Sequence, residues 1–275
     1  MSDVNNYRAI AISTALSKLF EHVIADAVHT VSDGDRYQFG FKDGHSTALC
    51  TSVLKRTVEH FVNRGSHVFA CFVDFSKAFD KVNYWKLFNK LLDDGVDVSI
   101  VRVLAFWYSR QEVCVRWNLT ISASFTTGNG TRQGGVLSPY LFTRYIRDLL
   151  NKVENSQCGC SVGGMCINVL AYADDIVLIA PSWRALQSLL HLLYDCILTP
   201  DMVCNAKRSV CMIFNPKDHA KTVSKTYPLF TVGAMQLEFV AKFRYLGHMI
   251  TNDLADDRDI QCEIRNMFFR TNILV

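Results

Sequence analysis

The sequence predicts an α+β fold, and three observations lead to this class. Short apolar runs rich in Val, Phe or Ile, typical of buried strands, occur at 68–75 and on both sides of the dipeptide Asp174-Asp175. Longer stretches repeat apolar residues at helical spacing. The two kinds of element do not alternate strictly, so we expect antiparallel hairpins covered by helices instead of a parallel sheet.

The composition is that of a folded protein. The 275 residues are 49% hydrophobic and 20% charged, which is enough to bury a large core, and the net charge is +3. No run approaches the roughly 18 apolar residues of a membrane span, and the N-terminus has no signal pattern. We therefore expect a soluble, intracellular protein without a membrane partner, and charge alone does not indicate nucleic acid.

The ten cysteines favour reduced, mostly buried side chains over a disulfide framework. The tightest set is Cys158, Cys160 and Cys166, which lacks the paired C-x₂-C spacing of a zinc site. A Gly-rich turn with incidental thiols is the favoured interpretation.

The first part of the chain reads as two helices and a strand. Thr14 is placed to cap an amphipathic helix that runs to about residue 30. A polar loop follows, Thr47 is placed to cap a second helix, and Gly65 is placed to end it. The run 68–75 then predicts a buried strand that ends at Asp74.

The middle of the chain is mainly helical. Helices are expected at 83–94 and 97–109, and residues 112–125 suggest a hairpin. The stretch 126–139 is rich in Gly and Thr and reads as a loop, after which Ser138-Pro139 opens another helix.

The rest of the chain predicts hairpins and two helices. Residues 169–180 read as strand, turn and strand, with the turn at Ala173-Asp174-Asp175, and Ser182 caps the next helix. Further strands are expected at 210–214, 228–240 and 243–251, and a helix begins at Asp256.

Asp174 and Asp175 carry the strongest chemical signal. The Asp-Asp pairs at 93–94 and 256–257 lie in polar surroundings, whereas 174–175 interrupts an apolar hairpin. Two adjacent charges there are costly unless a cation compensates them, and Mg²⁺ accepts carboxylates together with phosphate oxygens. Asp74 ends the other apolar strand and is the best third acid for a two-metal site, although taken alone it reads more readily as a buried Asp bonded to backbone amides.

Three motifs in order give these acids a family context. "FVDFSKAFDKV", "RQGGVLSPYLF" and "LAYADDIVLIAPS" resemble the palm motifs of reverse transcriptases, and the surrounding sequence resembles non-LTR (LINE-type) retrotransposons. Further matches are "NYRAIAISTALSKLFE", "QFGFKDGHSTA", "NAKRSVCMIF" and "FRYLGHMIT", so the resemblance runs from about residue 5 to 251.

The resemblance implies a right-hand polymerase that copies an RNA template into DNA from a DNA primer and deoxynucleotides. It implies fingers at about 1–65, a palm with finger insertions at about 66–252, and the truncated start of a thumb at 253–275. We expect the thumb to be largely absent and the chain to be a fragment of a longer element whose thumb and endonuclease domains lie outside it.

The resemblance also assigns the metal ligands. Asp74, Asp174, Asp175 and the backbone carbonyl of Phe75 would hold two Mg²⁺ ions, for which Mn²⁺ can substitute.

Nucleotide and primer contacts follow from the same motifs. Phe79 would exclude a ribose 2′-hydroxyl, although by itself it reads as core. The nucleotide-binding set implied by the resemblance is Phe79, Gln133, Gly134, Arg132, Lys42 and Arg208. Lys42 also fits a solvated loop, and Arg208 stands where relatives usually have Lys and cannot readily give up a proton. The primer grip would be Phe243, Tyr245, Leu246 and Gly247.

Two other functions stay open at this point. A truncated or domesticated relic that folds and binds nucleic acid with little catalysis fits the short C-terminal segment. A metal-dependent nuclease fits the acids but leaves Phe79 and "RQGG" unexplained.

Overall fold

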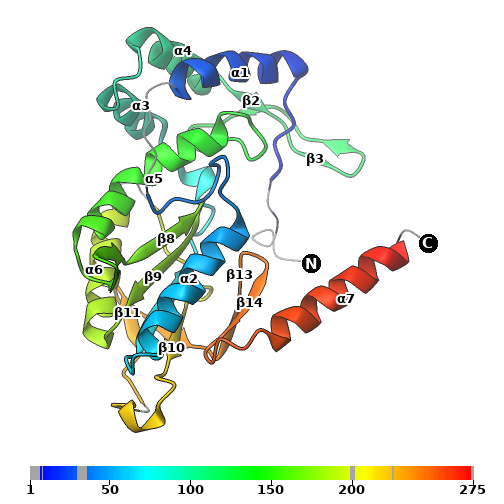
Figure 1. The fold of residues 1–275 in the computed structure, drawn as a ribbon. Coiled ribbons are helices and arrows are strands. Elements are labelled where there is room, and N and C mark those ends of the chain that lie inside the picture. Colours follow the sequence, from blue (N-terminus) through cyan, green and yellow to red (C-terminus); the bar gives the residue numbers. More distant parts are fainter. Residues whose placement is uncertain (1–6, 8, 30–35, 199–201, 225, 274–275) are drawn as a thin grey trace. The chain divides into compact units, whose positions relative to one another are not determined.

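The computed structural model describes residues 7, 9–29, 36–198, 202–224 and 226–273 (Figure 1). The chain divides into two compact units and passes between them repeatedly. Unit 1 comprises Met1–Asp35, Lys77–Asp148 and Ile197–Val203, and unit 2 comprises Arg36–Ser76, Leu149–Cys196 and Cys204–Val275. Helices and hairpins mix as expected, which confirms the α+β class.

Unit 2 is built on a six-stranded sheet in the order β11-β12-β10-β1-β9-β8. Its strands are β1 (Val68–Val73), β8 (Val169–Tyr172), β9 (Asp175–Ala180), β10 (Val210–Phe214), β11 (Phe230–Val232) and β12 (Met235–Phe239). Strand β1 lies between β9 and β10 and is antiparallel to both. Every residue of β1 is buried, which explains its continuous apolar sequence.

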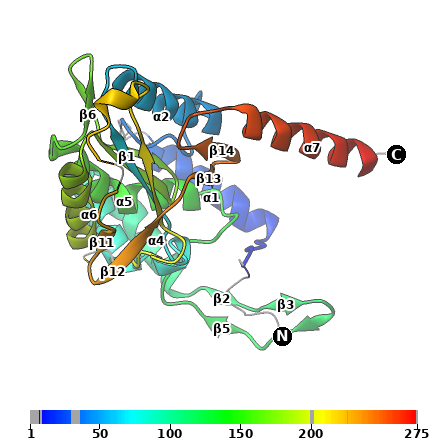
Figure 2. The same cartoon turned by 90° about the horizontal axis from the view of Figure 1, so that it is seen from below.

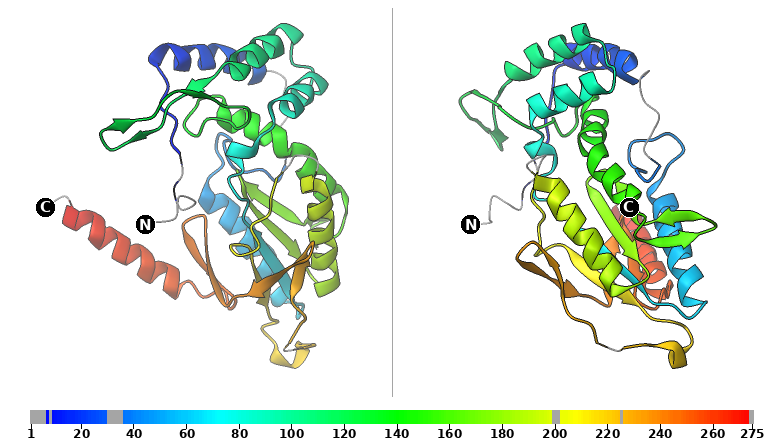
Figure 3. Two further views of the ribbon diagram at one scale, coloured as in Figure 1. Left: turned by 180° about the vertical axis from the view of Figure 1, so that it is seen from behind. Right: turned by 90° about the vertical axis from the view of Figure 1, so that its left-hand side faces the viewer.

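Two helices of unit 2 enclose the sheet, which lies between them (Figures 1, 2 and 3). They are α2 (Thr47–Val62) and α6 (Trp183–Leu198). Each buries residues that recur at helical spacing, which are Cys50, Leu54, Val58 and Val62 in α2 and Leu186, Leu189, Leu190 and Leu193 in α6. The buried side of each helix therefore consists of the regularly spaced apolar residues from which the helix was predicted.

A separate hairpin and a long helix complete unit 2. The hairpin joins β13 (Lys242–Tyr245) to β14 (His248–Thr251), and α7 (Asp257–Ile273) extends from it (Figure 2). Asp259 in the first turn of α7 accepts a hydrogen bond of 2.7 Å from the Met249 amide of β14. Unit 2 also contains a short helix, His219–Lys221, and the hairpin of β6 (Cys160–Val162) with β7 (Met165–Ile167).

Unit 1 is mainly helical. Its helices are α1 (Ala15–His29), η2 (Phe79–Lys81), α3 (Tyr84–Asp93), α4 (Val98–Ser109) and the first part of α5 (Ser138–Asn155), which continues into unit 2. Between α4 and α5 the chain forms a long hairpin, in which β2 (Glu112–Val113) pairs with β5 (Phe125–Thr126) and β3 (Arg116–Trp117) with β4 (Thr120–Ile121). The α-helices and this hairpin lie where the sequence predicts them, whereas the short helix η2 was not predicted.

The structure corrects one expected cap. Ser46, not Thr47, caps α2, because the Ser46 hydroxyl accepts a hydrogen bond of 3.1 Å from the Leu49 amide, and Thr47 is the first helical residue. Ser182 caps α6 as expected, by accepting a hydrogen bond from the Ala185 amide.

The boundaries of the fingers, the palm and the thumb stay predictions. Within the described ranges, no helix combines the length and the apolar character that crossing a membrane requires.

Burial of His67, just before β1, predicts a pH dependence of stability. The ring is 5% exposed, and its Nε2 accepts a hydrogen bond of 3.2 Å from the Val223 amide. Burial lowers the pKa of His67 below its ordinary value, and a hydrogen bond with Asn215 partly opposes this. The unfolded chain therefore binds a proton here more readily than the folded one, and stability is lost as the pH falls below about 6.5.

We expect His67→Gln, which keeps an acceptor but does not titrate, to weaken the loss of stability between pH 7.5 and 5.5. Urea unfolding at several pH values measures this effect. The control is His191→Gln on the exposed side of α6, which should follow the wild type. A variant at 67 with the wild-type pH dependence would contradict the assignment.

Candidate active site

One end of the sheet of unit 2 carries the three predicted acids. Val73, the last residue of β1, pairs with Ile176 of β9, and the Tyr172–Asp175 pair closes the β8–β9 hairpin. The next position of the β1–β9 register would place Asp74 across from Asp175, and antiparallel partners are about 5 Å apart between Cα atoms. The register thus brings the backbone of Asp74 beside the acidic turn.

The acids reach this place without entering the core. Asp174 is half-buried, Asp175 is exposed and the Asp74 side chain is 27% exposed. The apolar residues that flank them, Val73 and Ile176, are buried. A position at the strand ends lets the carboxylates keep part of their hydration while the sheet keeps its core.

The backbone of Asp74 is fixed by the segment 204–209. The Asp74 amide donates a hydrogen bond of 3.0 Å to the hydroxyl of Ser209, and the Asp74 carbonyl accepts one of 2.8 Å from the Asn205 amide. Phe75 forms a single antiparallel bridge with Cys204. Hydrogen bonds therefore satisfy both polar groups of the Asp74 backbone.

The electrostatic setting of Asp74 suits a cation. Its Oδ2 atom is buried and has no hydrogen-bond partner among the described residues. The Arg208 guanidinium lies 3.9 Å from Oδ2, and its side chain is 67% exposed. A buried carboxylate oxygen without a hydrogen bond is unusual and fits a group that receives a metal ion.

The chemistry of the three side chains is compatible with Mg²⁺. Among the described residues, no three His, Cys, Asp or Glu side chains gather closely enough to hold a metal ion by themselves. Mg²⁺ is usually held by one or two carboxylates together with water and phosphate oxygens. The assignment of Asp74, Asp174 and Asp175 as its ligands stays a prediction.

The acidic turn itself is held by Gln38. Ala173, the first residue of the two-residue turn, has a φ of 57°, which is unfavourable for a residue with a Cβ. The Gln38 carboxamide is 1% exposed, accepts a hydrogen bond of 2.9 Å from the Ala173 amide and donates one of 3.3 Å to the Ala173 carbonyl. Gln38, which lies outside the hairpin, therefore binds both the amide and the carbonyl of the strained residue Ala173.

The predicted primer-grip residues form the tip of the β13–β14 hairpin. Leu246 and Gly247 are its turn, with φ of 49° and 89°, and lie at or near the surface. Tyr245 is 3% exposed, and this burial raises the pKa of its hydroxyl. The hydroxyl lies 3.6 Å from the Cys50 sulfur. The ring of Phe243 packs 4.8 Å from that of Phe72 of β1. Tyr245 therefore packs inside unit 2, and the turn is the part that is open to a ligand.

The remaining predicted residue of unit 2, Lys42, is half-buried in the loop before α2. It follows Gln38 in the same segment. Its backbone carbonyl accepts a hydrogen bond of 3.2 Å from His45.

In unit 1, the predicted nucleotide-binding residues lie in and around the loop before α5. Phe79 is half-buried and stacks on Phe142 with ring centroids 4.2 Å apart. Gln133 is half-buried and its carbonyl accepts a hydrogen bond of 2.9 Å from Ala11. Gly134 is exposed with a φ of 103°, a conformation that requires glycine.

Arg132, another predicted nucleotide-binding residue, is engaged inside unit 1. Its guanidinium donates hydrogen bonds of 3.1 Å to Gln111 and to Ser17 and lies 3.6 Å from Glu21. It also lies over the Trp107 ring at 4.9 Å. These contacts join the loop before α5 to α1 and α4, and the nucleotide-binding role of Arg132 stays a prediction.

Glu21 organises the same loop, and the sequence did not single it out. Its side chain is 2% exposed and accepts hydrogen bonds from the amides of Val136 and Leu137, the residues just before α5. A carboxylate at this position satisfies free amides and complements the helix dipole. The sequence does place this glutamate on the apolar side of the helix predicted at 14–30, and a charged residue there could have indicated a buried structural role.

Gln38 and Ser209 were also missed as functional candidates. Both stand in motifs that carry the resemblance, "QFGF" and "NAKRS". Their roles depend on hydrogen bonds to residues 135 positions away, which no local pattern shows.

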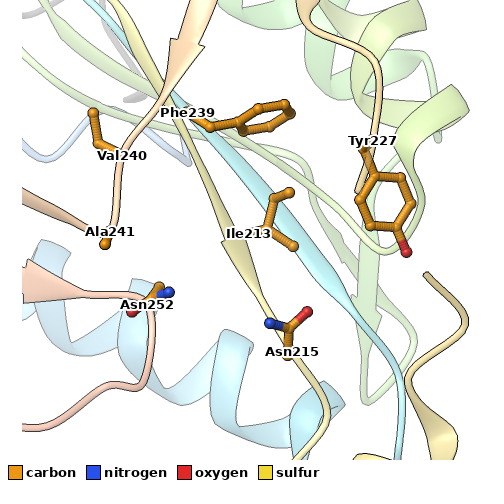
Figure 4. Close-up of a pocket in the computed structure, with 7 residues that line it drawn as sticks. All are labelled: Ile213, Asn215, Tyr227, Phe239, Val240, Ala241 and Asn252. Atoms are coloured by element: carbon orange, nitrogen blue, oxygen red, sulfur yellow. The ribbon is translucent and has the colours of Figure 1, made fainter. Parts of the chain in front are cut away.

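A pocket of about 240 Å³ lies at the other end of the sheet (Figure 4). Asn215, which lines it, follows Phe214, and Phe214 pairs with the first residue of β1. The lining residues are Ile213, Asn215, Tyr227, Phe239, Val240, Ala241 and Asn252. None is an acid or a predicted site residue, so this hollow is separate from the acidic turn.

A sheet of this kind, with one acid after a central strand and two at a neighbouring hairpin turn, has the palm fold of right-hand polymerases. Residues 2–250 match the family described as reverse transcriptase (RNA-dependent DNA polymerase). The chain therefore belongs to the reverse transcriptase family, as the motifs predicted.

Similar proteins come from mobile elements. The Pol polyprotein of the type-2 retrotransposable element R2DM of Drosophila melanogaster is 24% identical over 248 residues, which cover 88% of this chain and 23% of that protein. The RNA-directed DNA polymerase of the mobile element jockey of Drosophila funebris is 24% identical over 268 residues, or 94% and 28% of the two chains. The chain thus spans about a quarter of the length of these relatives.

A solved structure supports the fold. Apo telomerase from Candida tropicalis, truncated from its C-terminal domain, aligns with a TM-score of 0.57 and 13% identity. The alignment covers 87% of this chain and 45% of that one. At this identity the likeness shows the fold alone.

The Ser209 hydroxyl gives a prediction about the anchoring of Asp74. Ser209 is 1% exposed, so Ser209→Ala leaves the Asp74 amide without its acceptor. We expect the free energy of unfolding to fall by about 1–3 kcal/mol, measured by urea denaturation. The control is Ser188→Ala, whose hydroxyl lies on the exposed side of α6 and should matter little. Equal unfolding midpoints for the two variants would refute the anchoring role.

Proposed function

We propose that this chain is the catalytic part of an RNA-directed DNA polymerase of a retroelement. The proposal is carried by one observation, the placing of Asp74 beside the Asp174-Asp175 turn at the end of the sheet in a chain of the reverse transcriptase family. The partners are an RNA template, a DNA primer and deoxynucleotides, and the rest of a longer element supplies further domains. The fingers would lie at about 1–65, the palm at about 66–252 and the start of the thumb from 253.

The acids give the proposed site its chemistry. Asp74, Asp174, Asp175 and the carbonyl of Phe75 would hold two Mg²⁺ ions, with Mn²⁺ as a substitute. Bound ions of this kind favour attack by the primer 3′-hydroxyl on the α-phosphate and stabilise the pyrophosphate that leaves. The buried Oδ2 of Asp74 supports this assignment, because a metal would supply the partner that the described residues do not.

The other site residues bind and select in this proposal. Arg208 would stabilise negative charge on the phosphates, since its side chain is exposed beside Asp74. Lys42 would face the triphosphate, and the exposed Gly134 would let the backbone approach the nucleotide. Arg132 would hold the shape of the loop that presents Gln133. The Leu246-Gly247 turn would contact the primer.

Nucleotide incorporation tests this function. We expect residues 1–275 to extend a DNA primer on an RNA template weakly and distributively, only with Mg²⁺ or Mn²⁺, and less as salt increases. Asp174→Asn should lower the rate about a hundredfold or more, because it removes a metal ligand. The control is Asp93→Asn, the exposed member of the Asp-Asp pair at the end of α3.

Two results would count against the proposal. Equal rates for Asp174→Asn and Asp93→Asn would show that the acidic turn is not catalytic. No extension by the wild type, even with the thumb of a related polymerase fused to it, would favour a relic without activity.

Phe79 should select the sugar by size. A ring at this position excludes a 2′-hydroxyl, so Phe79→Val should raise ribonucleotide incorporation relative to deoxynucleotide by about tenfold. Steady-state incorporation of each nucleotide measures the ratio. Phe125→Val, which shortens an exposed ring of unit 1, is the control. An unchanged ratio would leave Phe79 as a core residue stacked on Phe142.

A further inference from the structure

The segment 37–40 is joined to the acidic hairpin by more than one kind of contact. The Phe39 amide donates to the Ala171 carbonyl at 2.7 Å, and the Ala171 amide donates to the Tyr37 carbonyl at 2.8 Å. Gln38 and Ala171 thus form a parallel bridge at the outer edge of β8. The segment extends the sheet and carries Gln38 to the turn.

The approach of this segment to the turn is unusually close. A Cβ at Gly40 would stand 2.5 Å from the Ala173 nitrogen and 3.2 Å from the Tyr172 carbonyl carbon. Both are backbone atoms that cannot move aside cheaply. Only glycine at position 40 therefore allows the segment to lie against the turn.

The Gln38 carboxamide is matched to what the turn needs. Its Oε1 accepts from two amides at 2.9 Å, those of Ala173 and Gly40, and its Nε2 donates to the Ala173 carbonyl. A glutamate would keep the acceptor and lose the donor, and an apolar side chain would lose all three bonds. Only an amide of this length supplies both kinds of group.

The energies favour a role in holding the turn. A left-handed φ strains a residue that has a Cβ, whereas hydrogen bonds to its buried amide and carbonyl stabilise the conformation in which they form. The bonds from Gln38 can therefore offset the strain at Ala173. Without them, the strain favours another turn conformation, which would move Asp174 and Asp175.

We propose that Gln38 is a positioning residue that holds Ala173 in its left-handed conformation and so sets the place of Asp174 and Asp175. Gln38 touches neither substrate nor metal in this role. The consequence for turnover rests on the proposed polymerase function, whereas the holding of the turn does not. A displacement of about 1 Å at reacting groups can cost a hundredfold in rate.

The test compares two glutamines that each bond to the amide and the carbonyl of a single residue. Gln187 of α6 is also buried, donates to the Thr231 carbonyl at 2.9 Å and accepts from the Thr231 amide at 3.0 Å, but it holds β11. Gln38→Met and Gln187→Met each remove such a pair while keeping a side chain of similar length. We expect kcat to fall about tenfold or more in Gln38→Met only, with similar losses of thermal stability in both.

Relief of the strain should rescue the first variant. Glycine adopts a positive φ without cost, so adding Ala173→Gly to Gln38→Met should restore about half or more of the lost kcat on a logarithmic scale. A packing role for Gln38 would not respond to this change. Ala173→Gly is also measured alone, so that the four proteins form a double-mutant cycle that measures the coupling between positions 38 and 173.

Amide hydrogen exchange gives a readout that needs no catalysis. In Gln38→Met the Ala173 amide should exchange about tenfold or more faster, while the Val177 amide inside β9 keeps its protection. Unchanged exchange at Ala173, equal kcat losses in the two Met variants, or failure of the rescue would each overturn the proposal. A wild-type chain without incorporation would count against the polymerase function, and the exchange result would still decide the role of Gln38.

Discussion

The need to hold like-charged carboxylates close together without burying them governs this fold. Two or three such charges in a core would cost many kcal/mol, yet a two-metal site needs them on rigid elements. In the sheet of unit 2, the buried part of each strand ends next to an acidic residue, so the acids stand on rigid strands and yet lie at the edge of the core. Strand β1 is fully buried up to Val73, and the hairpin is buried again from Ile176.

Neutral groups bind the backbone on both sides of the acidic site. Ser209 and Asn205 bind the backbone of Asp74, and Gln38 binds the backbone of Ala173. Hydrogen bonds of this kind fix the course of the chain at Asp74 and at Ala173. In the loop before α5 the arrangement differs, since the buried Glu21 forms an ion pair with the half-buried Arg132 and also accepts hydrogen bonds from the backbone. Charged side chains shape the backbone there, whereas neutral side chains do so beside the acids.

Most of the fold was predictable because its signals are local. The apolar runs of β1 and β9, the helical stripe of α6 and the hairpin turn follow from residues close in sequence, although Asp175, predicted in the turn, is the first residue of β9. Features that are long-range or depend on one side chain were not predicted. Ser46 replaces Thr47 as a cap because either hydroxyl suits that end, and the contacts of Arg132 with Glu21 and Trp107 join residues far apart in the sequence. The holding of Ala173 by Gln38 was invisible because it joins segments 135 residues apart.

The bridge between the segment 37–39 and β8 has a consequence for solubility. Strand β8 is the last of its sheet, and a last strand offers unpaired amides and carbonyls to any other extended chain. Here Tyr37 and Phe39 occupy the amide and carbonyl of Ala171 on that side. The same few residues that reach the acidic turn therefore also close part of an edge through which copies of the protein could otherwise join by strand addition.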